Sequence, residues 1–261
     1  MDTFAITGPL TLYVRLLHGS VTVRASDDVT EATVALTPRP GAERFAERIA
    51  VDLRGQTLTV RAPRGFIGRR DPGAGTVDAE ITVPTGTVLN VATDTADISL
   101  YGGSGTCDVA SGAGAIRLDT VGGNLRVRCG SSSVEAHAVT GSVHLRAGSG
   151  EIRFGTVGGA MDTSSGFGRL EVDVLRGVLR AKRGSGTALL KAVYGDVHLL
   201  SGSGDTTIGL PAGVTARLDL TSGSGSITST LPLDERQSGT GPVITVKART
   251  GSGDITVVRA A

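Results

Sequence analysis

The sequence has no tryptophan, three tyrosines and five phenylalanines among its 261 residues, and its formal net charge is only +1. The chain therefore has few aromatic side chains that could stack on bases or sugars. A nearly neutral chain also argues against a protein held on nucleic acid by bulk electrostatics. We find no specific nucleic-acid motif, although a local patch of charge could still bind an anionic polymer.

Long apolar runs are absent as well. No stretch approaches the roughly 18 uninterrupted apolar residues of a spanning helix. The N-terminus, M-D-T-F-A-I-T-G-P, has neither the basic region nor the apolar core of a secretory signal. We expect no membrane span and a cytoplasmic location, with surface display only by a non-standard route.

Motifs that carry enzyme chemistry are missing too. The chain has no G-x-G-x-x-G, no G-x-x-x-x-G-K-[ST] and no H-E-x-x-H. Glu135, Glu151 and Glu171 lie near one another in sequence pattern, as the paired carboxylates of glycosidases must, which leaves a carbohydrate-active β-helix enzyme as a less favoured alternative. We expect a protein that is not an enzyme and needs no cofactor.

Glycine, with 39 residues, is abundant and periodic. A nine-residue step runs through fourteen positions, of which twelve are glycine: Ala96, Gly105, Gly114, Gly123, Ser132, Gly141, Gly150, Gly159, Gly168, Gly177, Gly186, Gly195, Gly204 and Gly213. Apolar residues follow two and four places later in most units. This small-x-apolar-x-apolar pattern is typical of a strand with one buried face, followed by a tight turn in which glycine is needed.

The units alternate in kind, so the true period is 18. Every second unit has a larger aliphatic residue, such as Val139 or Val157, where the units between have Gly148 or Gly166. A short fixed period indicates a solenoid, because each repeat buries its apolar face only by stacking on its neighbours. We predict an all-β fold, a parallel β-solenoid of the β-helix or β-roll kind. Each 18-residue coil is made of two 9-residue halves, in a two-sided or three-sided cross-section.

Outward positions predict which side chains stack from coil to coil. On one face an 18-residue period aligns a structural charge ladder of Arg117, Glu135, Arg153 and Glu171. The equivalent column of the other face reads Asp108, Arg126, His144, Asp162, Arg180 and His198. This second face is a candidate basic interaction face, and its residues are Arg126, Arg128, His144, Arg146, Arg180 and Lys182.

The ends of the chain depart from the period. Residues 1–92 are β-rich but irregular and form an N-terminal part and cap, residues 93–212 are the regular array, and residues 213–261 are irregular C-terminal strands and a cap. Residues 63–76 and 231–242 are loops by their Gly and Pro content. We expect residues 243–249 and 255–259 to be the closing strands.

Metal binding is not expected. The calcium β-roll repeat places an aspartate two residues after its second glycine, and here that position holds Ile98, Ile116, Val134, Ile152 and Leu170. The four histidines, His18, His137, His144 and His198, are too scattered to share one ion. Cys107 and Cys129 fall about 13 Å apart on the predicted strands, too far for a disulfide.

Several segments resemble a known family. The repeated S-G-x-G-x-[IV]-x-[LVF] units, G-S-V-T-V-R-A at residues 19–25, L-T-V-R-A-P at 58–63 and A-R-T-G-S-G-D-I at 248–255 are similar to the bacterial "putative adhesin" family of β-strand-repeat proteins. The resemblance implies a β-solenoid-like fold and a role in adhesion, with no catalytic residues to carry over. We predict a non-enzymatic structural or interaction module, or alternatively an exported surface adhesin. Its partner is a protein, a second copy of the chain or an anionic polymer.

Overall fold

The computed structural model of the chain describes residues 1–63, 75–231 and 243–260. The predicted loops at 63–76 and 231–242 lie almost wholly outside the described residues. The chain forms two compact units, Met1–Ser133 and Val134–Ala261. The division into parts at residues 92 and 212 stays a prediction.

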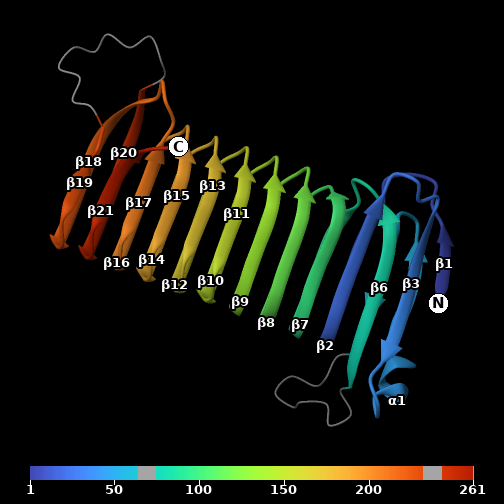
Figure 1. The fold of residues 1–261 in the computed structure, drawn as a ribbon. Coiled ribbons are helices and arrows are strands. Elements are labelled where there is room, and N and C mark those ends of the chain that lie inside the picture. Colours follow the sequence, from blue (N-terminus) through green and yellow to red (C-terminus); the bar gives the residue numbers. More distant parts are fainter. Residues whose placement is uncertain (64–74, 232–242, 261) are drawn as a thin grey trace. The chain divides into compact units, whose positions relative to one another are not determined.

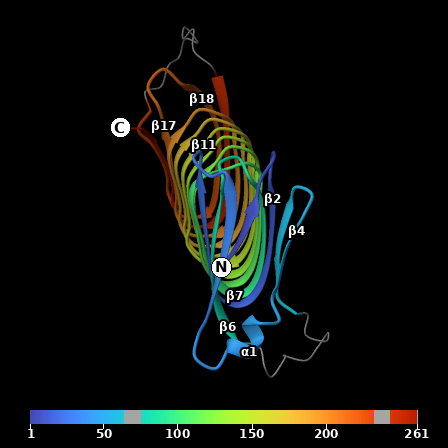
Figure 2. The same cartoon turned by 90° about the vertical axis from the view of Figure 1, so that its right-hand side faces the viewer.

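The second unit is built from two stacks of parallel strands (Figure 1). One stack contains β10 (Val143–Ser149), β12 (Met161–Phe167), β14 (Leu179–Ser185) and β16 (Val197–Ser203). The other contains β11 (Ile152–Val157), β13 (Leu170–Leu175), β15 (Ala188–Val193) and β17 (Thr206–Leu210), and it begins with the end of β9 (Leu125–Val139). Each coil therefore has two strands, and the solenoid of this unit is two-sided (Figure 2).

Register within these stacks follows the predicted 18-residue period. Val134, Ile152 and Leu170 are paired in one column, and each is 1% exposed. Phe154 and Leu145 are fully buried in the same interior. The apolar residues at alternate positions thus point between the two sheets, and their burial is the main source of stability.

The C-terminal end does not follow chain order. Strand β20 (Val243–Ser252) pairs with β16 on one side and with β18 (Thr215–Ser224) on the other. Likewise β21 (Ile255–Arg259) lies between β17 and β19 (Ile227–Ser229). The prediction that residues 243–249 and 255–259 close the stack is wrong. The coil of β20 and β21 lies between the coil of β16 and β17 and the coil of β18 and β19, although β18 and β19 come earlier in the sequence (Figure 1).

The first unit has the same kind of insertion at its own start. Strand β2 (Thr11–Ser26) pairs in parallel with β7 (Val88–Ser104) on one side and with β5 (Thr57–Arg61) and β6 (Thr76–Pro84) on the other. Strand β8 (Cys107–Val121) continues from β7 at the 18-residue period.

Antiparallel strands complete the first unit. The antiparallel strands are β1 (Asp2–Ala5), β3 (Glu31–Pro38) and β4 (Ala50–Arg54). The R-G-Q turn joins β4 to β5 as an antiparallel hairpin. A single helical turn, α1 (Glu43–Ala46), is anchored by the buried Phe45.

Candidate functional site

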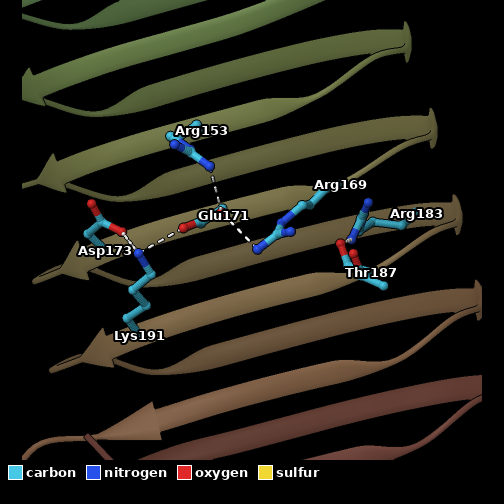
Figure 3. Close-up of polar contacts among 7 residues, drawn as sticks. All are labelled: Arg153, Arg169, Glu171, Asp173, Arg183, Thr187 and Lys191. Carbon is cyan, nitrogen blue, oxygen red and sulfur yellow. Dashed lines mark hydrogen bonds and ion pairs between the residues drawn. The ribbon is translucent and has the colours of Figure 1, made fainter. Parts of the chain in front are cut away.

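The two outward faces of the second unit differ in how their charged side chains are paired. On the β13 side, Glu171 is only 4% exposed although it points outward, because cationic side chains cover it (Figure 3). Its carboxylate oxygens lie 3.2 Å from Arg153, 3.0 Å from Arg169 and 2.8 Å from Lys191. Lys191 also contacts Asp173 at 2.7 Å. The charges of this cluster are therefore compensated within the cluster.

The predicted charge ladder contributes part of this cluster. Glu135, Arg153 and Glu171 occupy consecutive coils in register, and Arg153 donates a hydrogen bond to Glu171. Arg117 belongs to the first unit, where it pairs with Ser99 of β7. Arg169 and Lys191 are outside the predicted column, and the sequence pattern did not indicate them.

The ion pairs change the titration of Glu171. The hydrogen bond from Lys191 is the main cause that lowers its pKa, burial of the carboxyl opposes this, and the charges of Lys191, Arg153 and Arg169 add to the lowering. A carboxyl whose pKa is lowered by folding stabilises the folded state above its unfolded pKa of about 4.3 and loses that contribution as pH falls through the folded value.

We expect Glu171→Gln to lower the free energy of unfolding by about 1–2 kcal/mol at pH 7, because Arg153 and Arg169 lose their carboxylate partner and Lys191 keeps only Asp173. The difference from wild type should shrink as pH falls below about 4.3 and through the lowered pKa of folded Glu171. Urea unfolding at pH 7 and at a series of lower pH values measures it.

Glu135→Gln is the matched control, since Glu135 is exposed on the same face and no ion pair of it is found among the described residues. Its effect at pH 7 should stay within about 0.5 kcal/mol. An equal loss for both variants would contradict the special role of Glu171.

The opposite sheet, on the β14 side, carries the candidate site. Its outward residues form two columns, read here from β10 through β12, β14, β16 and β20 to β18. The first column is His144, Asp162, Arg180, His198, Lys247 and Asp219. The second column is Arg146, Ser164, Lys182, Leu200, Arg249 and Thr221. Insertion of β20 beside β16 thus adds Lys247 and Arg249 to a face on which Arg180 and Lys182 were predicted.

These residues gather around β16. Arg180 and Lys182 lie on β14, Lys247 and Arg249 on β20, and His198 and Leu200 between them on β16. We call these six residues the basic patch. All four cations are exposed, and Leu200 is 48% exposed in their midst. The patch therefore presents concentrated positive charge around one apolar side chain.

The cations of the basic patch are largely uncompensated. In the described part of the chain, no carboxylate lies within ion-pair distance of Arg180, Lys182 or Lys247. Arg249 reaches Asp219 at 3.7 Å, with both side chains about half exposed, and a pair of that kind contributes little. This is the opposite of the β13 side, where each cation near Glu171 has a partner.

An open hollow of about 500 Å³ lies within the patch. Lys182 and Arg249 line it, Leu200 lies between them on β16, and Gly202 and Gly251 form its side. The hollow continues a row of stacked glycines: Gly148, Gly166, Gly184, Gly202, Gly251 and Gly223. At every glycine of the row except the first, an added Cβ would lie within 2.6 Å of the carbonyl oxygen of the preceding glycine. Because glycine has no side chain, this strip of the sheet does not rise above its own backbone.

The residues of the predicted basic face are divided between the two units. In the second unit, Arg146 and Lys182 share a column, and Arg180 shares strand β14 with Lys182. His144 lies on β10, the strand of Arg146. Arg126 and Arg128 belong to the first unit, where Arg128 pairs with Asp108 at 3.1 Å.

A second hollow, of about 430 Å³, occurs in the first unit. His18, Arg39 and Asp97 line it, but Arg39 is already bound to Asp78 at 3.1 Å. Arg39 lowers the pKa of the Asp78 carboxyl chiefly through this hydrogen bond. Arg39 in this hollow therefore already has an anionic partner, unlike most cations of the basic patch.

The thiols and histidines form no reactive cluster in the residues that the structure describes. Cys107 and Cys129 are free, as predicted. Burial raises the pKa of Cys107 to about 12, so its thiol stays protonated at neutral pH. No group of three or more potential metal-ligating side chains occurs in the described ranges. Independence from metal stays a prediction.

Fold and surface define a β-solenoid-like repeat protein. The chain belongs to the Toastrack family, DUF4097, whose profile matches residues 20–259. The resemblance to a β-strand-repeat family of unknown function is thereby confirmed. No helix in the described residues is long and apolar enough to cross a membrane.

Two solved structures are similar over nearly their full length. One is a "putative cell adhesion protein" from Clostridium sporogenes, 13% identical, with 99% of this chain and 98% of that chain covered and a TM-score of 0.24. The other is a "putative adhesin" from Parabacteroides distasonis, 8% identical, with 98% and 95% covered and a TM-score of 0.47. No curated protein matches the chain.

Proposed function

We propose that the protein is a non-enzymatic interaction module that binds an anionic partner through the basic patch. The observation that carries this proposal is the contrast between the two faces of the second unit. Cations around Glu171 are paired at 2.8–3.2 Å, whereas Arg180, Lys182 and Lys247 face solvent. Exposed cations left without carboxylates concentrate a positive potential that attracts anions.

The same contrast disfavours self-association through the cluster around Glu171. A second copy does not offer Glu171 and Asp173 freely to the patch, because both are already bound to cations of their own face. An anionic partner of a different kind satisfies the patch without breaking these pairs. The buried, protonated Cys107 supports a role in binding rather than in nucleophilic chemistry.

Retention on immobilised heparin at low salt tests the proposal. The wild-type chain should be retained, and Lys182→Glu/Arg249→Glu should elute at markedly lower salt, because two cations at the hollow become repulsive. Arg61→Glu/Arg117→Glu is the matched control, since it changes the net charge equally at exposed positions of the first unit. Equal elution of the two double variants would show that net charge, and not the basic patch, governs binding.

The location of the protein is a separate proposal. A cytoplasmic module and an exported adhesin both fit a basic binding face. Fractionation of native cells separates them, because the first appears in the soluble fraction and the second at the cell surface.

A further inference from the structure

The spacing of the cations on the basic patch narrows the class of anion. In the column that borders the hollow, cations occur on alternate coils: Arg146 on β10, Lys182 on β14 and Arg249 on β20. Coils stack at about 4.8 Å, so these cations repeat at roughly twice that distance. The coils between them present Ser164 and Leu200, a hydroxyl and an apolar side chain.

The neighbouring column adds Arg180 and Lys247 on the same coils as Lys182 and Arg249, so the cations of the patch still occur on alternate coils. This spacing is too sparse for a nucleic acid strand. A strand of duplex DNA carries one phosphate per about 3.4 Å of rise, so most of its charges would find no cation here. Some of them would instead meet Asp162 or Asp219 of the neighbouring column, and neither column contains a Phe, Tyr or Trp on which a base could stack.

The hollow also disfavours a flat anionic surface such as a bilayer. Gly202 and Gly251, which have no side chains, line the roughly 500 Å³ space together with Lys182 and Arg249. A narrow linear chain can contact the backbone at these glycines, whereas a planar array of headgroups meets the long cationic side chains first.

We propose that the basic patch binds a linear acidic polysaccharide that carries one carboxylate on every second sugar. Carboxylates would meet Arg146, Lys182 and Arg249 in turn, and the uncharged sugars between them would place hydroxyls at Ser164 and a C–H face on the exposed Leu200. Ligand sites commonly combine an apolar surface with a few polar groups in this way. The inference rests on the proposed function, and it favours the exported adhesin over the cytoplasmic module.

Titration calorimetry with the full chain at about 0.15 M salt tests the inference with defined probes. Hyaluronan, with one carboxylate per disaccharide, should bind at least tenfold more tightly than oligo-dT or vesicles that contain anionic lipid. Its affinity should fall only shallowly with salt, because a polymer with such widely spaced carboxylates holds few condensed counterions to release. Lys182→Ala should weaken it tenfold or more, and Arg117→Ala should leave it unchanged.

Leu200→Lys gives the sharper test, because it fills the gap in the column at an exposed position. Binding of oligo-dT should rise more than tenfold, and binding of hyaluronan should change less than threefold. Oligo-dT or vesicles that bind wild type as tightly as hyaluronan would overturn the polysaccharide inference while the proposed anion binding stands. Equal elution of Lys182→Glu/Arg249→Glu and Arg61→Glu/Arg117→Glu from heparin would instead overturn the proposed function.

Discussion

Gly168→Val should destabilise the second unit by about 2–6 kcal/mol. Gly168 has φ +123°, a conformation that costs a branched residue about 1–3 kcal/mol. A Cβ there would also press on the backbone carbonyl of Gly150, directly across from it on the neighbouring coil, and relief of such a clash costs a further 1–3 kcal/mol or so. Thermal and urea unfolding measure the loss.

Gly213→Val separates the two causes. Gly213 also has positive φ, at +82°, but a Cβ there would meet no atom within 4 Å. This variant should lose only the conformational part, about 1–3 kcal/mol. Equal losses at Gly168 and Gly213 would mean that contact between coils is not what requires glycine.

Val246→Asp should cost more than about 4 kcal/mol, enough to unfold the end of the second unit. Val246 is fully buried between Val197 of β16 and Leu218 of β18. An aspartate there must bury a carboxyl with no partner or break the stack. Circular dichroism on heating, with limited proteolysis of the C-terminal coils, reports the outcome.

Val243→Asp is the control for that variant, because Val243 begins the same strand but is 59% exposed. Its effect should stay within about 0.5 kcal/mol. A Val246→Asp protein as stable as the Val243→Asp protein would contradict the placement of β20 inside the stack.

The regular part of the fold was predictable from sequence because its register is over-determined. Slipping a strand by one residue would turn Ile152 outward and Arg153 inward, and the 18-residue period repeats that constraint on every coil. The paired column of Glu135, Arg153 and Glu171 follows directly from it. The tight turn expected from sequence is only part of the reason for glycine, because a Cβ at Gly168 would also meet the backbone of the adjacent coil.

The C-terminal order was not predictable from the same reasoning. S-G-S-G-S-I at residues 222–227 and G-S-G-D-I at 251–255 have the same small-x-apolar spacing, so either segment can bury its apolar residues against β16 and β17. Local pattern does not distinguish the two. The sequence therefore indicated Arg180 and Lys182 but could not add Lys247 and Arg249 to the same patch.

The cluster around Glu171 shows a second limit. Column positions predict the pairing of Arg153 with Glu171, but Arg169 and Lys191 reach that carboxylate from outside the column. Long side chains can span such diagonal distances across a sheet, and which carboxylate they reach depends on rotamers that a periodic pattern does not specify.

Insertion of β20 and β21 inside β18 and β19 sets the order in which this end of the protein can be completed during synthesis. Residues 215–229 leave the ribosome before residues 243–259, and chains begin to fold as they emerge. If β18 docks on β16 first, it forms a complete but wrong coil that must detach before β20 can take its place. We therefore expect the last step of folding at this end to wait until residues 243–259 have been synthesised, and to be slower than stacking of the regular coils that precede them.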